Sequence, residues 1–122
     1  MLRRLIPGLS LLALSACVVP PQVVYVPQAP IVACDTRFNV VNQSNRTVER
    51  LYFSSSALNS WGEDQLGQGV LPPGRSAFYQ PVTAGAHDFR IVWANGRDAE
   101  IRGVDVCVAS RITITNSGLR AG

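Results

Sequence analysis

The only histidine of the chain, His87, lies directly before Asp88 and is the first candidate for catalytic chemistry. Serines are plentiful, so a Ser-His-Asp arrangement for acyl transfer is conceivable. The Gly-x-Ser-x-Gly pattern that presents a nucleophilic serine does not occur in the sequence. A histidine at the start of a strand is usually a solvated turn residue. We therefore expect His87 to be solvated and the protein not to be an enzyme.

A polar loop around Trp61 holds the other candidate groups. Its oxygen ligands are those of Asn59, Ser60, Glu63 and Asp64. Calcium prefers six to eight oxygens, usually with several carboxylates, and this loop supplies only the carboxylates of Glu63 and Asp64. In the competing interpretation Ser60 or Asn59 caps a short helical turn, and Asp64 accepts hydrogen bonds from nearby backbone amides. With a single histidine and no Cys-x-x-Cys pair, the sequence predicts no metal centre and no cofactor.

Trp61 itself has two expected roles. An aromatic residue in a loop either plugs one end of a β-sandwich or contacts a partner. Gly62 beside it and Leu66 after it favour the plug. If the domain instead binds a small ligand, the possible binding loop consists of Asn59, Trp61, Glu63 and Asp64.

Residues 1–16 have the composition of a bacterial signal peptide. Arg3 and Arg4 form a basic start, and residues 5–16 follow without a charge and end in small side chains. A positive segment, an apolar stretch and small residues are the features that direct export and cleavage.

Cys17 directly follows this segment. The sequence Leu14-Ser15-Ala16-Cys17 resembles the lipobox of bacterial lipoproteins, which consists of a leucine, two small residues and a cysteine. The resemblance implies that Cys17 becomes the lipidated N-terminus of the mature chain, and two or more acyl chains anchor a protein stably. Val18 stands where an aspartate would retain a lipoprotein in the inner membrane, which implies the outer membrane, facing the periplasm.

Cys34 and Cys107 remain once Cys17 is lipidated. Thiols of exported proteins are oxidised by default, so we expect these two cysteines to form a disulfide. Two free buried thiols, or an intermolecular bond through Cys34, are the alternatives.

The elements that must position these groups follow from a chain of 122 residues, which is enough for one domain. Residues 18–33 are rich in proline and carry no charge, which predicts an extended tether that reaches roughly 50 Å. The chain has no lysine, and beyond Arg3 and Arg4 its arginines nearly balance its acidic residues. This balance argues against nucleic acid or another polyanion as a partner.

After the tether, short runs of β-branched and aromatic residues alternate with turn residues. The expected strands are 38–41, 47–53, 76–80, 88–94, 97–101 and 111–115, with at most a turn of helix within 56–66. Phe89, Ile91 and Trp93 alternate toward one face of a strand. Asn95 and Gly96 predict a two-residue hairpin turn with positive φ at both positions. The pattern predicts an all-β fold, a small antiparallel immunoglobulin-like β-sandwich, with a small β-barrel as the alternative.

Several segments of this region carry a family resemblance. They are residues 38–42, 51–52, 61–67, 71–74, 88–90, 95–96 and 104–107, and the Trp-Gly-x-Asp-x-Leu-Gly run that starts at Trp61 is the most specific. Over roughly residues 37–115 the chain resembles a group of small exported bacterial β-sandwich domains of uncharacterised function, found often in alphaproteobacteria. Members often carry a cysteine just before the Asp-Phe-Arg strand, where this chain has Ala86 and His87. The resemblance implies a fold and a compartment, and no activity.

The expected organisation is a lipoprotein signal peptide (1–16), a lipidated Cys17 with a Pro-rich tether (17–34), a β-sandwich domain (35–117) and a C-terminal tail (118–122). We expect a lipid-anchored envelope protein whose non-catalytic domain binds or supports another envelope component. An envelope protein, bound through the loops or an exposed strand edge, is the expected partner besides the membrane. The alternative is a ligand-binding module for a glycan or calcium that uses residues 59–66.

Overall fold

The computed structural model describes residues 34–122, which form seven strands. The strands are β1 (Phe38–Asn42), β2 (Val48–Ser55), β3 (Ser76–Tyr79), β4 (Ala86–Trp93), β5 (Asp98–Asp105), β6 (Arg111–Thr115) and β7 (Gly118–Ala121). The predicted signal peptide, Cys17 and the tether up to residue 33 lie outside the described residues. Within 34–122 there is no helix with the length and apolar character needed to cross a membrane.

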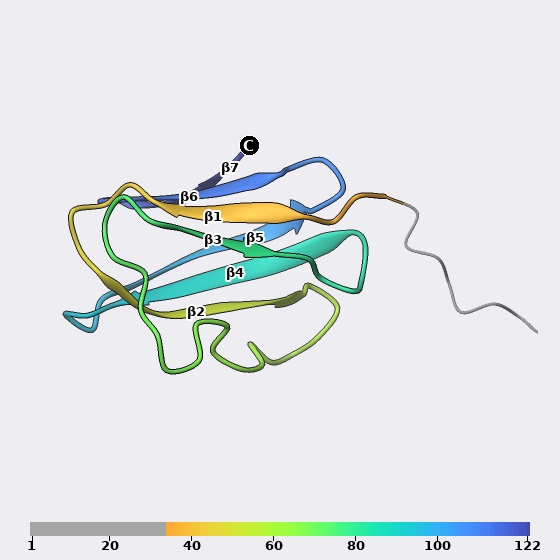
Figure 1. The fold of residues 1–122 in the computed structure, drawn as a ribbon. Helices are drawn as coiled ribbons and strands as arrows, with labels where there is room; N and C mark the ends of the chain where they lie inside the picture. The colour runs from red at the N-terminus through yellow and green to blue at the C-terminus, as the bar shows by residue number, and fades with distance from the viewer. Residues whose placement is uncertain (1–33) are drawn as a thin grey trace, which may run out of the picture.

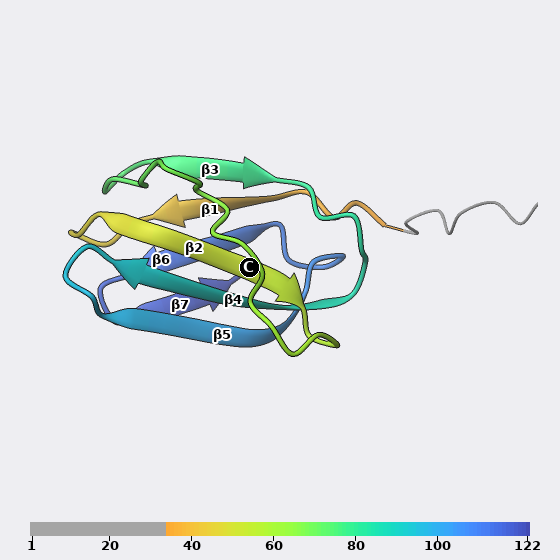
Figure 2. The same cartoon turned by 90° about the horizontal axis from the view of Figure 1, so that it is seen from below.

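The strands form two sheets that pack face to face (Figures 1 and 2). One sheet has the order β3-β1-β6-β7 and the other the order β2-β4-β5. β1 and β6 run parallel, and the remaining neighbours run antiparallel. Because the two sheets share no strand and do not close on each other, the predicted all-β sandwich is confirmed and the barrel alternative is wrong.

Side chains from both sheets meet in one apolar core. Phe89, Ile91 and Trp93 point into it from β4, as their alternation predicted, and none is more than 6% exposed. Phe38 of β1 packs edge-to-face against Phe53 and Phe89, with ring centroids 5.1 and 5.2 Å apart. The core therefore occupies the inner face of the β2-β4-β5 sheet and leaves the outer face of that sheet to polar side chains.

β5 extends to Asp105, beyond the predicted end at residue 101. A bulge changes which of its side chains face the core, so the strand does not show one continuous alternation. The pairing of β4 with β5 shifts register between His87 and Phe89, so β5 has one residue more than its partner there. Gly103 takes a φ of 69°, which glycine adopts without strain. The bulge buries Val104 while Arg102 stays exposed on the outer face.

The turn between β4 and β5 differs from the predicted one. Gly96 has a φ of 87°, but Asn95 does not have a positive φ. The Gly96 amide donates to the Trp93 carbonyl at 2.8 Å, and the Trp93 amide donates to the Arg97 carbonyl at 2.8 Å. This is the pattern of a three-residue loop, a type I turn closed by a left-handed glycine.

The predicted C-terminal tail is also wrong, because residues 118–121 form β7. β7 pairs with the edge of β6, with Leu119 opposite Ile114. The segment is too short to show an alternation of its own, and its backbone hydrogen bonds to β6 create the strand. Residues 56–66, where we expected at most one helical turn, contain turns and bends and no helix.

The connections gather at two ends of the sandwich (Figure 1). The Cys34 end contains residues 34–37, where the described chain begins, and the loops 56–60, 80–85 and 106–110. The distal end contains the loops 43–47, 72–75, 94–97 and 116–117. At the Cys34 end the predicted disulfide joins Cys34 to Cys107, with Cα atoms 5.4 Å apart.

Candidate functional site

A hollow of about 260 Å³ lies where the loop after β2 folds against the outer face of the β2-β4-β5 sheet. The sheet contributes Asp88 and Arg102, and the loop contributes Asn59, Ser60 and Trp61. We call this the Trp61 hollow. Two of the four residues of the predicted binding loop, Asn59 and Trp61, therefore line one site together with residues that are distant in the sequence.

Glu63 and Asp64, the other two, do not line the hollow. Asp64 instead ties the loop to β2, because its Oδ1 accepts hydrogen bonds from the amides of Leu51 and Leu66, both at 3.0 Å. This is the predicted pairing of Asp64 with backbone amides. The predicted helix cap at Asn59 or Ser60 is wrong, since no helix follows either residue.

Trp61 is not the predicted plug of the sandwich. It is only half-buried and does not belong to the buried core. The guanidinium carbon of Arg102 lies over its ring, 4.9 Å from the centroid, in a cation–π arrangement. Of the two predicted roles, the geometry supports contact with a ligand or partner.

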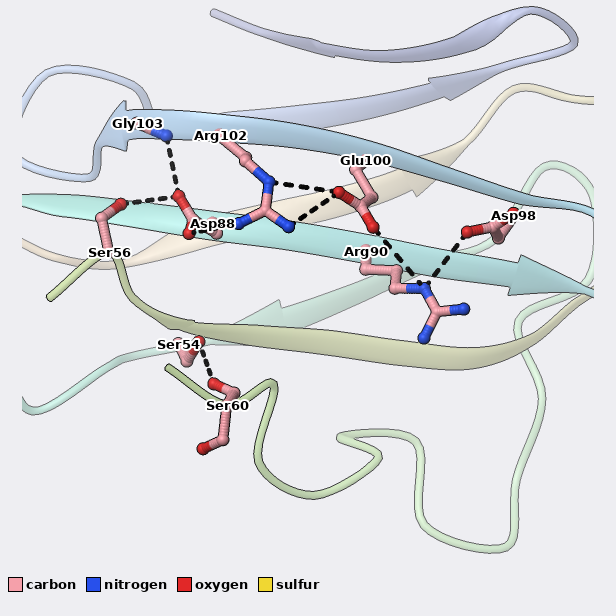
Figure 3. Close-up of polar contacts among 9 residues, drawn as sticks. All are labelled: Ser54, Ser56, Ser60, Asp88, Arg90, Asp98, Glu100, Arg102 and Gly103. Carbon is pink, nitrogen blue, oxygen red and sulfur yellow. Dashed lines mark hydrogen bonds and ion pairs between the residues drawn. The ribbon is translucent and has the colours of Figure 1, made fainter. Parts of the chain in front are cut away.

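Charged side chains of alternating sign run along this face of the sheet (Figure 3). Arg102 lies 3.3 Å from Asp88 and 3.0 Å from Glu100. Arg90 lies 3.9 Å from Glu100 and 3.3 Å from Asp98. The exposed pairs among them, those with Glu100 and Asp98, add little to stability, about 0–1 kcal/mol each. They hold Arg102 in place and balance its charge.

Asp88 is the most buried group of the hollow, at 8% exposure. Its Oδ1 accepts hydrogen bonds from the Ser56 hydroxyl at 2.7 Å and from the Gly103 amide at 2.9 Å (Figure 3). The Ser56 hydrogen bond, with help from Gly103 and Arg102, lowers the pKa of Asp88 below its ordinary value of 3.8. Asp88 is therefore a fixed carboxylate that orients its neighbours.

His87 is buried, at 1% exposure, so the expectation of a solvated turn residue is wrong. Its ring nitrogens lie 2.9 Å from the Gly85 carbonyl and 3.1 Å from the Thr83 hydroxyl. Because Asp88 pairs on the outer face with Ser56 and Gly103, the conceivable Ser-His-Asp arrangement is not assembled here. His87 holds the loop 80–85 against β4.

Sequence reasoning missed Asp88 and Arg102 as parts of the site. The charged residues at every second position, Asp98, Glu100 and Arg102, are visible in the sequence and indicate a strand face turned to solvent. No pattern in the sequence shows that Trp61 covers the end of that row. That contact depends on the path of the loop and on the bulge at Gly103.

The polar groups that meet in the Trp61 hollow are hydroxyls, a carboxamide, a paired carboxylate and guanidinium, and the indole ring. Their charges cancel, so the site is suited to a polar ligand without strong charge. Compared with models of protein families, with curated proteins and with solved structures, the chain has no match in any of the three.

Proposed function

We propose that this protein is an envelope lipoprotein, anchored through Cys17, whose β-sandwich binds a carbohydrate component of the envelope without catalysing a reaction. The Trp61 hollow is the observation that carries the proposal. A sugar ring offers C–H groups that pack on an aromatic face and hydroxyls that pair with amides and charged groups. In the hollow, Trp61 is available for the C–H groups. Asn59, Asp88 and Arg102 are available for the hydroxyls.

Calcium, the other small ligand considered, has less support. Asp64 uses one oxygen for two backbone amides, and Glu63 lies apart from the hollow. Nowhere in residues 34–122 do three or more His, Cys, Asp or Glu side chains gather where they could hold a metal ion. A glycan needs no cluster of carboxylates, and the hollow presents the carboxamide, hydroxyls and paired charges that can hydrogen-bond its hydroxyls.

The anchor is supported by the order of segments at the N-terminus. A basic start, an uncharged stretch, small residues and Cys17 occur at the spacing expected of a lipoprotein signal. Cys17→Ser should abolish incorporation of labelled palmitate and release the protein from the membrane fraction. If the variant stays with the membranes and the wild type takes up no palmitate, the anchor is wrong.

The carbohydrate proposal is tested by nuclear magnetic resonance on the indole N–H of Trp61. N-acetylglucosamine oligosaccharides and soluble peptidoglycan fragments are the probes. We expect a saturable shift of the Trp61 signal. Isothermal titration calorimetry, which does not depend on the indole signal, should show that Trp61→Ala binds the probes at least about tenfold more weakly, because aromatic contacts dominate such sites.

Phe78→Ala is the matched control, because Phe78 is an aromatic residue that is 60% exposed on β3, outside the hollow. It should bind the oligosaccharides as tightly as the wild type. Equal weakening by Phe78→Ala and Trp61→Ala, or no saturable shift with either probe, would overturn the proposal.

A protein partner is the second candidate, favoured by the Cys34 end. Leu58, Val82 and Val108 lie in three different loops there and are 61%, 86% and 82% exposed. A photo-crosslinking residue at position 82 or 108 should trap one envelope protein in intact cells, whereas the same residue at position 95 of the distal end should not. Trapping of the same protein from all three positions would count against a specific surface.

A further inference from the structure

A second hollow lies at the distal end and has a volume of about 150 Å³. Three loops meet around it. The β1–β2 loop contributes Asn45 and Arg46, the β6–β7 turn contributes Asn116, and the end of β4 and the loop after it contribute Trp93 and Arg97. None of these residues belongs to the Trp61 hollow, so the two sites are separate.

Arg46 and Arg97 lack acidic partners. Among residues 34–122, every ion pair within 4.0 Å involves another arginine. The distal loops also contain Arg75 and contain no Asp or Glu. Two acidic residues lie just beyond these loops. Asp98 is already paired with Arg90 at 3.3 Å, and Glu49 takes part in none of the ion pairs among residues 34–122. Positive charge therefore accumulates at this end although the domain as a whole is nearly balanced.

Internal hydrogen bonds hold the three loops in place. The Trp93 indole N–H donates to the Ser44 hydroxyl at 3.1 Å, and the Ser44 amide donates to Asn42 Oδ1 at 3.0 Å. The Asn45 amide donates to Asn116 Oδ1 at 2.8 Å and so links the first and last distal loops. The two guanidinium groups are thus carried by a preformed backbone.

The donors of this hollow determine the chemistry of its ligand. Arginine can only donate hydrogen bonds, and Asn116, whose oxygen is used by Asn45, has its Nδ2 as the remaining donor. Donors with two positive charges complement an oxyanion. A phosphoryl group fits better than a carboxylate, because it has three acceptor oxygens and a charge of about −1.5 to −2.

We propose that the distal end is a phosphate site, in which Arg46 and Arg97 bind a phosphoryl group carried by another envelope component. The site acts independently of the Trp61 hollow. The loops that carry it lie at the opposite end of the sandwich from the start of the described chain (Figure 2). On the anchoring through Cys17 proposed above, this is the end away from the point of attachment.

The two tryptophans of the chain allow a direct test, because each hollow contains one of them. The full chain is titrated with inorganic phosphate at constant ionic strength, and both indole N–H signals are followed. We expect a saturable shift of the Trp93 signal without a shift of the Trp61 signal. Arg46→Gln and Arg97→Gln should each weaken phosphate binding by about tenfold.

Arg120→Gln is the control, because Arg120 is an exposed arginine near the end of β7 and outside the hollow. It should bind phosphate like the wild type. Binding that is unchanged in Arg46→Gln and Arg97→Gln, or weakened equally in Arg120→Gln, would overturn the site. Acetate binding as tight as phosphate binding would overturn the choice of a phosphoryl group. If oligosaccharides do not shift the Trp61 signal, the carbohydrate proposal is wrong, but the phosphate-dependent shift of the Trp93 signal still tests the distal site.

Discussion

The three loops between strands at the Cys34 end contain no charged residue, whereas the distal end carries Arg46, Arg75 and Arg97 and no acidic residue. The Cys34 end also exposes apolar side chains, of which Val82 is 86% exposed. Overall composition conceals this contrast, because positive and negative charges are nearly equal beyond the N-terminal segment. Where the charges lie is therefore more informative about partners than how many there are.

The two ends are also held together by different bonds. At the Cys34 end the disulfide joins the start of the described chain to the β5–β6 turn. At the distal end a buried side chain, Asn42, donates to the carbonyls of Arg46 and Leu71, both at 2.9 Å, and accepts from Ser44. Asn42 thus connects the β1–β2 loop to the segment that precedes β3.

This difference indicates which kind of substitution should destabilise each end. A disulfide acts mainly by restricting the unfolded chain, so it places few demands on the loops around it. Cys107 itself is exposed, as is Val108, whereas Val106 belongs to the core. A buried hydrogen-bond network stabilises only while every group has its partner. One covalent bond should therefore contribute most to the stability of the Cys34 end. At the distal end, stability should depend on single polar side chains.

The largest effect should come from removing the disulfide. Cys34→Ser with Cys107→Ser opens a connection of sequence separation 73, which should lower the free energy of unfolding by about 4 kcal/mol. Chemical denaturation measures the change. In hydrogen exchange the amide of Val106, which donates to Gly85 at the Cys34 end, should lose more protection than that of Val48, which donates to Leu71 at the distal end.

Cys17→Ser is the control for the disulfide, because it removes a cysteine outside the pair and should leave the stability of the domain unchanged. Equal stability of the double variant and the wild type would show that the crosslink does not hold this end.

Asn42→Ala should be the next most damaging change. Asn42 is fully buried, and its removal leaves the carbonyls of Arg46 and Leu71 without their donor, at a cost of about 3 kcal/mol. Thermal unfolding measures the loss. Asn45→Ala, which changes an exposed asparagine of the loop that follows Asn42, should cost less than about 0.5 kcal/mol. Equal losses from the two substitutions would contradict the role of the network.

Asp88→Asn should lower stability at neutral pH by about 2 kcal/mol, because it weakens hydrogen bonds to a buried carboxylate. The fold lowers the pKa of Asp88, so the stabilisation is complete above the ordinary value of 3.8 and is lost as the pH falls through the lowered value. The difference between wild type and variant should therefore shrink in acid. Denaturation curves from pH 7 to pH 2 test this.

Asp35→Asn provides the comparison for Asp88→Asn. Arg37 lowers the pKa of Asp35 to about 2, but both partners are exposed, and solvent screens the pair. The free energy of unfolding at neutral pH should barely change. A difference between wild type and Asp88→Asn that stays constant down to pH 2 would show that the charge of Asp88 is unimportant.

Arg97→Gln should also have only a small effect on stability. No acidic residue among residues 34–122 pairs with Arg97, so the change should stay within about 0.5 kcal/mol. The same substitution should markedly weaken phosphate binding, which would separate ligand recognition from folding at this end. A large loss of stability would instead assign Arg97 to the internal network.

Much of the fold follows from local patterns. The alternation of Phe89, Ile91 and Trp93 identifies β4 and its buried face, because successive side chains of a strand point to opposite sides. The pairing of Cys34 with Cys107, which the structure contains, was predicted from the number of cysteines and from the expected export of the chain. The turn at Asn95-Gly96 was located correctly, but its type depends on how β4 and β5 meet.

Other features were decided only by contacts between distant segments. β7 exists because the edge of β6 was free to pair, and the burial of His87 depends on the path of the loop 80–85. The bulge at Gly103 is required because the inward positions of β5 change parity between Ile101 and Val104. Each of these depends on a partner that no local pattern can identify.

The two hollows also combine features that follow from the sequence with features that depend on contacts between distant segments. The residue types were determined by the sequence: an aromatic loop residue at Trp61, charged residues at every second position of β5, and arginines in turns. Tertiary structure alone placed Trp61 over Arg102 and brought Arg46 and Arg97 to one hollow. The physical reason is that alternation and turn chemistry act over a few residues, whereas a site at a sandwich end or sheet face is assembled by strand order and register.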